Sequence, residues 1–469
     1  MRFIKPLFIL IFVGCVAMPL AALHAADPAT YAYVLLGQGT KGTVAMARAV
    51  IAAPNRACPS LTASGQKPVA MTLRSNPNPA TFPVTVCEAI YPAGKSYSVG
   101  GIALPKVDLT ATPDRVVVVG DSGCKNSDKQ PCDPASWPFA SVLATAAAEK
   151  PNLLVHVGDY NYRGTPSSIV VNGQPVKVYD AGDADDEDEE DGVTPPGPYY
   201  SQNMTGSSVP DSWAPWQADF FAPAGAALSA APWVFARGNH ELCSRAGPGF
   251  LYFLDQGSSL PGASGVQNAC PNQDQQTPAA LLFLPPIQVA MGNLSMAVVD
   301  TANADDTGVS YRARYNAQLE TVVAGKPNWV VTHRPFWGIM KGPSFINATL
   351  QSALAATKKQ AFPASVTLVV SGHMHRFQAM AFDKGRPPQF IVGTGGVAQS
   401  KRFPKENPFS MKVDGQTATG LGLKAFSLMR IDLGKKGAWT AKLKGTDGKT
   451  LVHCTSDWAS TKEPVCVLK

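Results

Sequence analysis

The stretch Val369-Val370-Ser371-Gly372-His373-Met374-His375-Arg376 places two histidines directly after an apolar run. The run, residues 364–370, is short, rich in β-branched residues and followed by a glycine, a pattern that predicts a buried strand. Alternate residues of an extended segment point to the same side, so the imidazoles of His373 and His375 can face one point. Imidazole is the commonest metal ligand in proteins, so the stretch predicts a metal site at a strand end. The alternative is two loop histidines without a function.

Four further apolar segments of the chain end in residues of metal-ligand type. Strand–helix–strand order over residues 115–157 indicates an α/β layer, and such sheets collect their ligands at the carboxyl ends of the strands. One carboxylate can bridge two cations, and a mixture of carboxylate, amide and imidazole suits Fe, Mn or Zn. The candidate ligands at these strand ends are Asp121, Asp159, Tyr162, Asn239, His333, His373 and His375.

These strand ends carry five short motifs in a fixed order. The motifs are Gly120-Asp121-Ser122-Gly123, Gly158-Asp159-Tyr160-Asn161-Tyr162, Gly238-Asn239-His240-Glu241, Val330-Val331-Thr332-His333 and Gly372-His373-Met374-His375. Together they resemble the calcineurin-like metallophosphoesterases, over residues 114–432. Many members of that family have Asp-x-His in the first motif, whereas Gly123 takes the histidine position here and Tyr162 is present in the second motif. This combination resembles the purple acid phosphatases in particular.

The resemblance implies an α+β fold, a four-layer α/β/β/α metallophosphoesterase sandwich with a small N-terminal β-sandwich domain. Short apolar runs separated by turn residues, from Tyr31 to about Val107, favour that β-sandwich independently. The expected organisation is a signal peptide over residues 1–25, an accessory domain over 26–107, a catalytic domain over 108–435, and a β-rich tail over 436–469 that closes the catalytic domain.

The resemblance also implies a ligand set and a chemistry. Metal one is held by Asp121, Asp159, Tyr162 and His375, and metal two by Asp159, Asn239, His333 and His373. Asp159 bridges the two ions, which are Fe(III) at the tyrosinate site and a divalent Fe, Zn or Mn at the other. A metal-bound hydroxide attacks phosphorus. His240 is the expected acid for the leaving group or a phosphate-binding donor, and Glu241 is expected to orient it.

Several of these residues have plainer interpretations. Asp121 and Asp159 can cap the helices that follow their strands. Tyr162 can be ordinary packing, and the neighbouring Tyr160 makes the register of the second motif ambiguous. His156 lies inside its strand and is interpreted as a core residue.

Two arginines that follow strand-end histidines have the same ambiguity. Arg334 and Arg376 can bind phosphate, but strand-end arginines mostly form surface ion pairs.

The N-terminus has the three parts of a secretory signal peptide. Arg2 and Lys5 precede the apolar residues 7–16, small residues follow, and cleavage after Ala25 is the simplest expectation. A lipoprotein attached through Cys15 is an alternative with an unfavourable sequence context. A membrane anchor is a second alternative, but the apolar core is short for a bilayer span.

Eight cysteines remain after the signal peptide, and an even count in an exported chain predicts disulfides. Pairing of sequence neighbours keeps the loops short, although eight cysteines allow 105 connectivities. The chain has no Cys-x-x-Cys pair, which argues against structural zinc. The expected pairs are Cys58–Cys87, Cys124–Cys132, Cys243–Cys270 and Cys454–Cys466.

The 469-residue chain has a formal net charge of +6, although residues 180–191 contain nine acidic residues. Like-charge blocks are usually solvated loops, and a calcium loop is disfavoured because the spacing lacks the EF-hand pattern. The remaining basic body concentrates anionic substrates, and no motif supports nucleic-acid binding.

The sequence therefore predicts an exported phosphoesterase that hydrolyses small phosphate monoesters. A phosphodiesterase or nucleotidase of the same superfamily is the alternative within this chemistry, and the residues expected to decide between them line the pocket at 164–210 and 244–280. A non-catalytic binding protein that keeps the fold is the alternative from another class, which a complete ligand set disfavours.

Overall fold

The structure, a computed structural model, describes residues 29–126, 130–162, 168–171, 174–177, 211–243, 245–256, 270, 282–306, 308–339, 345–400, 407–457 and 465–469. The predicted signal peptide with Cys15, the acidic residues 180–191 and most of the expected pocket residues lie outside these ranges. Across the described ranges, helices that combine the length and the apolar character of a bilayer span do not occur.

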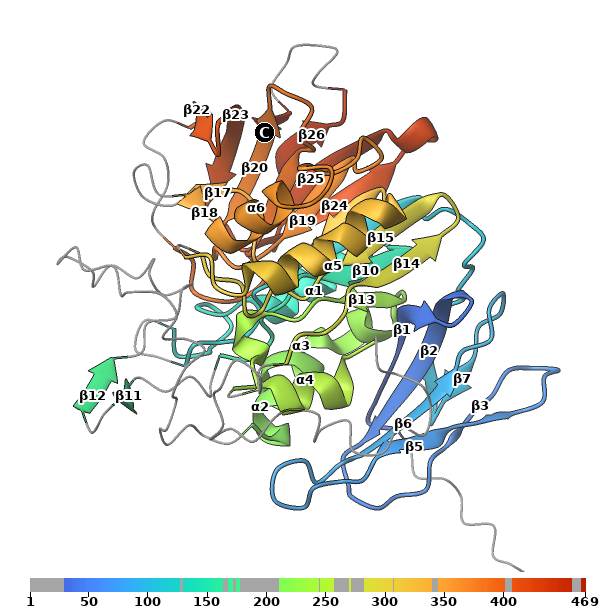
Figure 1. Cartoon of the computed structure of the whole chain (residues 1–469). Coiled ribbons are helices and arrows are strands. Elements are labelled where there is room, and N and C mark those ends of the chain that lie inside the picture. Colours follow the sequence, from blue (N-terminus) through green and yellow to red (C-terminus); the bar gives the residue numbers. More distant parts are fainter. Residues whose placement is uncertain are drawn as a thin grey trace, which may run out of the picture.

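A mixed sheet of eleven strands forms one half of the molecule (Figure 1). Strands β9, β10 and β13 are parallel at its centre, and β24 to β27 extend it on one side by antiparallel pairing. In order across the sheet, the strands are β27 (Cys466–Leu468), β26 (Thr450–Thr455), β25 (Trp439–Gly445), β24 (Ser427–Leu433), β9 (Arg115–Val119), β10 (Leu153–His156), β13 (Trp233–Phe235), β1 (Tyr31–Gly39), β2 (Gly42–Ile51), β6 (Thr85–Ile90) and β5 (Thr72–Ser75).

A second mixed sheet of eight strands forms the other half. Strands β15, β16, β19 and β21 are parallel, and the others pair antiparallel at the two edges. In order, the strands are β14 (Ile287–Met291), β15 (Leu294–Val298), β16 (Trp329–Val331), β19 (Leu368–Ser371), β21 (Gln389–Val392), β20 (Phe377–Phe382), β23 (Gln416–Leu423) and β22 (Phe409–Val413). Four two-stranded pairs complete the strands of the described residues: β3 (Ser60–Leu61) with β4 (Val69–Ala70), β7 (Ser98–Val99) with β8 (Ile102–Ala103), β11 (Ser168–Val171) with β12 (Gln174–Lys177), and β17 (Gly338–Ile339) with β18 (Phe345–Ile346).

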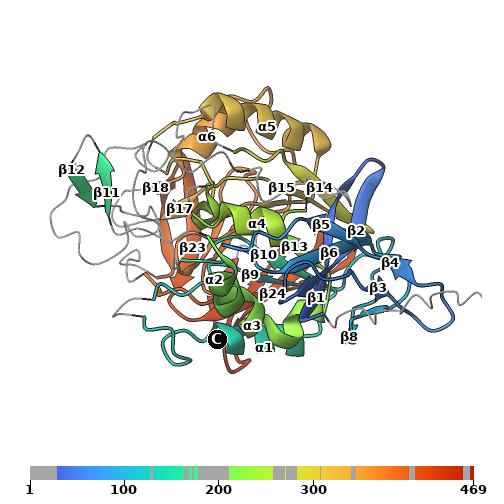
Figure 2. The same cartoon turned by 90° about the horizontal axis from the view of Figure 1, so that it is seen from below.

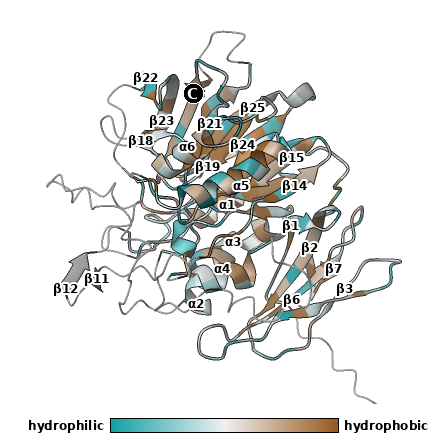
Figure 3. Cartoon of the chain, viewed as in Figure 1, coloured by the Kyte–Doolittle hydropathy of each residue, from teal (hydrophilic) through white to brown (hydrophobic). Residues whose placement is uncertain are grey.

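The largest apolar cluster lies between the two sheets. Val118 and Val155 of the first sheet belong to it together with Val331 and Val370 of the second. The alternate residues of the same strands are also buried, because helices cover the outer faces, and this explains why the central strands are continuous apolar runs. Figure 3 shows these strands in brown beneath the helices.

Helices lie on both outer faces, and Figure 2 shows α5 and α6 on one side and α1 to α3 on the other, with the strands between them. The helices that pack on the first sheet are α1 (Phe139–Ala148), α2 (Trp213–Trp216), the π-helical turn η1 (Gln217–Phe221), α3 (Ala222–Ala224), the 3-10 turn η2 (Gly225–Ser229) and α4 (Gly247–Phe253). Those on the second sheet are α5 (Arg312–Gly325) and α6 (Ala348–Ala355). Two further 3-10 turns are η3 (Asn239–Glu241) and η5 (Lys435–Gly437).

The N-terminal strands continue the first sheet, because β1 pairs in parallel with β13 through Leu35 and Trp233. Buried side chains of β2 and β5 bond to the carboxyl end of α4: Arg48 donates to the carbonyl oxygen of Phe253, and Arg74 donates to that of Leu251 at 2.9 Å. Guanidinium groups suit the unpaired carbonyls at a helix end. Strand pairing thus crosses the expected boundary at residue 107, and a separate domain over 26–107 stays a prediction.

Four disulfides join the predicted partners, which confirms the short-loop pairing. They are Cys58–Cys87, Cys124–Cys132, Cys243–Cys270 and Cys454–Cys466. The last joins β26 to β27, which supports the C-terminal strands as an edge of the first sheet.

Candidate metal centre

The loops that follow β9, β10, β13, β16 and β19 meet at the carboxyl ends of the strands and bring the five motifs together. Within the five motifs, four non-glycine residues have a positive φ: Asp121 (55°), Asp159 (59°), His373 (77°) and His375 (48°). Such backbones cost free energy and persist where the surroundings hold them, typically at functional sites. The strained positions coincide with four of the predicted ligands.

Two motif glycines are required by the close approach of these loops. Gly158 has a φ of 103°, and a Cβ atom there would lie 2.6 Å from Nδ1 of His333. A Cβ atom at Gly238 would lie 2.0 Å from Oδ1 of Asp159. Neither neighbour can move away without displacing a predicted ligand, so these positions accept only glycine.

The first cluster joins Asp121, Asp159 and His375, whose ligand atoms all lie within 4.8 Å of one another. The hydroxyl of Tyr162 lies 3.1 Å from Oδ2 of Asp159, 3.1 Å from Nε2 of His375 and 3.4 Å from Oδ1 of Asp121. A Cβ atom at Gly123 would lie only 2.8 Å from Cδ2 of Tyr162. The lack of a side chain at Gly123 therefore leaves the space that the phenol ring uses.

The second cluster joins Asp159, His333 and His373, so Asp159 belongs to both. Nε2 of His333 lies 3.0 Å from Oδ2 of Asp159 and 2.9 Å from Oδ1 of Asn239. Nδ1 of His333 lies 2.8 Å from the carbonyl oxygen of Val157, a contact that assigns a proton to Nδ1 and leaves Nε2 as the nitrogen that faces Asp159 and Asn239. All seven predicted ligands are buried and lie in or beside these two clusters.

The buried charges of the two clusters favour a bound cation. Burial raises the pKa of Asp121 well above its usual range, and the nearby charge of Asp159 adds to the effect although His333 opposes it. Burial lowers the pKa of His333, but Asp159 and Asp121 outweigh it and bring the value to about 9. Buried like charges of this kind are costly unless a cation compensates them. Oxygen and imidazole donors together fit Fe, Mn or Zn.

His240 and Glu241, in the turn η3, have different surroundings. The ring of His240 packs on Tyr162 with 3.8 Å between ring centroids, and its amide donates to Oδ1 of Asp159 at 2.9 Å. The carboxylate of Glu241 accepts from the amides of Asp159 (3.0 Å), Tyr160 (2.8 Å) and Gly238 (3.0 Å). Burial raises the pKa of Glu241 to about 8. Glu241 thus fixes two ligand loops, whereas we expected it to orient the imidazole of His240.

The structure separates the residues that the sequence left ambiguous. The hydroxyl of Tyr160 donates to the carbonyl oxygen of Ala236 at 2.9 Å, on the helix-covered side, while that of Tyr162 lies at the first cluster. His156 is a core residue, because its ring stacks on Tyr160 and its Nε2 lies 2.9 Å from Oγ of Ser122.

Sequence reasoning did not identify Asp306 as a residue beside the site, and it favoured a surface ion pair for Arg334. Arg334 is buried, with 4% of its surface exposed, and pairs with Asp306, so it is not a surface ion pair. Arg376 is also buried and donates to Oγ of Ser400 at 2.6 Å. Asp306 lies in a loop and does not directly follow a strand, so the strand-end pattern does not select it.

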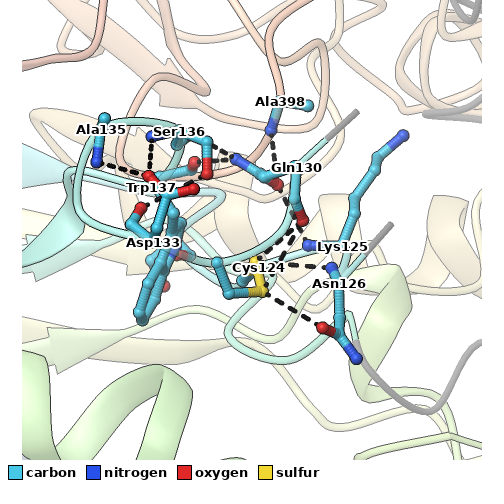
Figure 4. The surroundings of a disulfide bond; sticks show 12 residues. Cys124, Lys125, Asn126, Gln130, Asp133, Ala135, Ser136, Trp137 and Ala398 are labelled. Carbon is cyan, nitrogen blue, oxygen red and sulfur yellow. Dashed lines mark hydrogen bonds between the residues drawn. A yellow bond between two sulfur atoms is a disulfide. The ribbon is translucent and has the colours of Figure 1, made fainter. Parts of the chain in front are cut away.

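A loop closed by the disulfide Cys124–Cys132 begins directly after the first motif, and Figure 4 shows its surroundings. The side-chain amide of Gln130, within the loop that Cys124–Cys132 closes, donates to the carbonyl oxygen of Gly396 at 2.8 Å. Its oxygen accepts from the amides of Lys125 (3.0 Å) and Ala398 (3.1 Å). This loop therefore links the segment after Asp121 to the segment after β21.

Comparison with protein families matches residues 114–377 to the calcineurin-like phosphoesterase model, which covers more than half of the chain. The chain belongs to this family. Among solved structures, its fold resembles the purple acid phosphatase PPD1 from yellow lupin (Lupinus luteus) seeds, with a TM-score of 0.50 and 13% identity over 90% of this chain and 73% of that one. This match confirms the predicted resemblance at the level of the fold.

A second solved structure is more distant. GAP50, the anchor in the inner membrane complex of Plasmodium, matches with a TM-score of 0.39 and 11% identity, over 73% of this chain and 88% of that one. A search of curated proteins finds no match.

Proposed function

We propose that the chain is a two-metal phosphoesterase of the purple acid phosphatase type that hydrolyses small phosphate monoesters. The observation that carries the proposal is the pair of buried Asp/His clusters that share Asp159, with the hydroxyl of Tyr162 at the first of them. The helices on both outer faces support a four-layer α/β/β/α arrangement for the catalytic part, and residues 108 and 435 are its proposed limits.

The proposed ligand sets follow the two clusters. Asp121, Tyr162 and His375 hold one ion, and Asn239, His333 and His373 hold the other, with Asp159 between them. Fe(III) at the tyrosine site and a divalent Fe, Zn or Mn at the second are the proposed ions. Bound there, the two ions would supply Lewis-acid activation of water and neutralise the charge of the phosphate.

His240 is the proposed acid for the leaving group. Its backbone amide is fixed on Asp159 and its ring on Tyr162, so the imidazole has a defined place beside the clusters. Such positioning is what general acid catalysis requires, because a proton must be delivered at hydrogen-bond distance. Glu241 contributes indirectly, since its carboxylate holds the loops that carry Asp159 and Asn239.

The experiment compares p-nitrophenyl phosphate with bis(p-nitrophenyl) phosphate as substrates of the purified protein. We expect faster hydrolysis of the monoester, loss of activity after dialysis against a chelator, and recovery when metal is restored. Faster hydrolysis of the diester would favour the phosphodiesterase alternative. Two bound ions without hydrolysis of either ester would support the non-catalytic binding protein instead.

We also propose that the chain is exported, as a secreted or periplasmic protein. Four disulfides support an oxidising compartment, since such bonds are rare in the cytosol of most organisms. The mass of the mature protein checks this proposal: an N-terminus near Ala26 and no free thiols are expected. An intact Met1 with eight free thiols besides Cys15 would contradict it.

A further inference from the structure

The carboxylate of Asp306 is surrounded by three buried side chains next to the second cluster. Its Oδ2 lies 2.8 Å from Nε2 of His373 and accepts from Nη1 of Arg334, and its Oδ1 accepts from Nδ2 of Asn347 at 2.7 Å. All four side chains are at least nine-tenths buried. Asp306 belongs to neither Asp/His cluster, so its contacts concern His373 and not a metal ion directly.

These contacts determine which nitrogen of His373 carries the proton. Nη1 of Arg334 lies 2.9 Å from Nε2 of His373, so Nε2 can either accept from Arg334 or donate to Asp306. In the first case the proton would be on Nδ1, which is buried and has no hydrogen-bond partner in the described part of the chain. A buried unsatisfied donor costs about 1–3 kcal/mol. With the proton on Nε2, Asp306 accepts it and Nδ1 keeps a lone pair.

We propose that Asp306 is a positioning residue for the second metal site. It holds His373 in the form protonated at Nε2 and fixes the ring, so that Nδ1 is the nitrogen that binds the ion shared with Asn239 and His333. The inference rests on the proposed two-metal function. Carboxylates that accept from the second nitrogen of a metal-binding histidine orient the ring and increase its basicity.

Asp306 has a second effect through Arg334. A guanidinium beside His373 repels a cation at that site, and the pairing with Asp306 offsets this charge. The guanidinium of Arg334 and the side-chain amide of Asn347 both donate to the carboxylate of Asp306, and such donors favour its charged form.

The position of Asp306 is fixed by the start of helix α6. The side chain of Asn347 accepts from the amide of Leu350 at 2.9 Å as the N-cap, and the amide of Ala348 donates to the carbonyl oxygen of Asp306 at 2.8 Å. The backbone and the side chain of Asp306 are thus both bonded to this helix start. Helix α6 therefore supports Asp306, the residue that positions the proposed ligand His373. A well-ordered metal site needs such support from a regular element.

The test is a titration of the metal-free Asp306→Asn protein with Zn²⁺. The variant keeps the size of the side chain but removes its charge. We expect one of the two ions to bind about 10–100-fold more weakly, the usual effect of losing such a partner, and the other to bind as in the unaltered protein. Binding is measured by calorimetry and by metal content after dialysis, so the readout does not depend on activity.

Asp305→Asn is the matched control. It removes the same charge one residue earlier, where the carboxylate accepts from the amide of Gly308 at 2.9 Å and from Oγ of Ser310 at 3.1 Å. We expect this variant to bind both metal ions as tightly as the unaltered protein does. Equal weakening in the two variants would overturn the inference, because it would show a general effect of charge or of the loop.

If Asp306→Asn does not fold, Asn347→Ser tests the same positioning role of Asp306. Serine also caps helices, but it lacks the amide that donates to Asp306, so a smaller weakening of the same single ion is expected. Unchanged binding of both ions in the folded variants would overturn the inference and leave the proposed function intact. An unaltered protein that binds fewer than two ions would overturn the proposed function itself.

Discussion

Replacement of Asp159 by alanine is expected to release both metal ions and to abolish hydrolysis. Asp159 is the one described residue that belongs to both Asp/His clusters, and its Oδ2 lies within 3.1 Å of His333 and Tyr162 on either side. A single electrostatic stabiliser of a transition state is worth about 10²–10³ in rate. Loss of two cations together should therefore reduce kcat by at least about 10³-fold. Elemental analysis and kinetics measure the two effects.

Asp121→Ala is the control that makes this prediction specific. Asp121 belongs only to the first cluster, so its removal should weaken the ion at the tyrosine site and leave the second ion in place. Both aspartates have a positive φ, so the two alanine variants introduce comparable backbone strain. If Asp159→Ala kept two ions at full occupancy, Asp159 would not be the bridging ligand.

Asp159→Asn separates the charge of Asp159 from its structural contact. The amide of His240 donates to Oδ1 of Asp159, and an asparagine oxygen can still accept that bond. Asparagine also tolerates a positive φ better than alanine does. We expect weaker binding of both ions with an unchanged circular dichroism spectrum, which would attribute the loss of metal to the missing charge.

The strand ends and the disulfides could be predicted from the sequence because both depend on local patterns. Apolar runs that end in Gly-Asp or Gly-His locate buried parallel strands and the ligands that follow them, as for Asp121 and His373. The preference for short disulfide loops favours pairing between cysteines that are neighbours in the sequence. The family match and the fold confirm the class that these motifs indicate.

Contacts between distant segments could not be predicted in this way. Leu35 and Trp233 join the N-terminal strands to the central sheet although they lie 198 positions apart in the chain, and no periodicity predicts such a pairing. Glu241 is adjacent to His240 in sequence, but the turn η3 directs its carboxylate to backbone amides of another loop. Asp306 acts from a loop through His373, so only the folded chain brings it to the site.

Replacement of Tyr162 by phenylalanine is expected to remove the visible colour of the oxidised protein. An isolated phenol ionises near pH 10, so a tyrosinate at neutral pH requires a strong Lewis acid such as ferric iron beside it. Tyrosinate on ferric iron gives a charge-transfer band in the visible range. The hydroxyl of Tyr162 lies among the atoms of Asp121, Asp159 and His375, so its removal should abolish the band.

Tyr160→Phe is the matched control, since it removes the same hydroxyl two residues earlier. That hydroxyl bonds only to the carbonyl oxygen of Ala236 among the described residues, so the colour should stay and stability should fall by about 1 kcal/mol.

Tyr162→Phe keeps the ring that packs on His240, so the proposed acid stays in place and activity should fall only in part. An active but colourless protein with two divalent ions would contradict the purple acid phosphatase assignment. It would leave the family membership standing, because that depends on the motifs and not on the tyrosine.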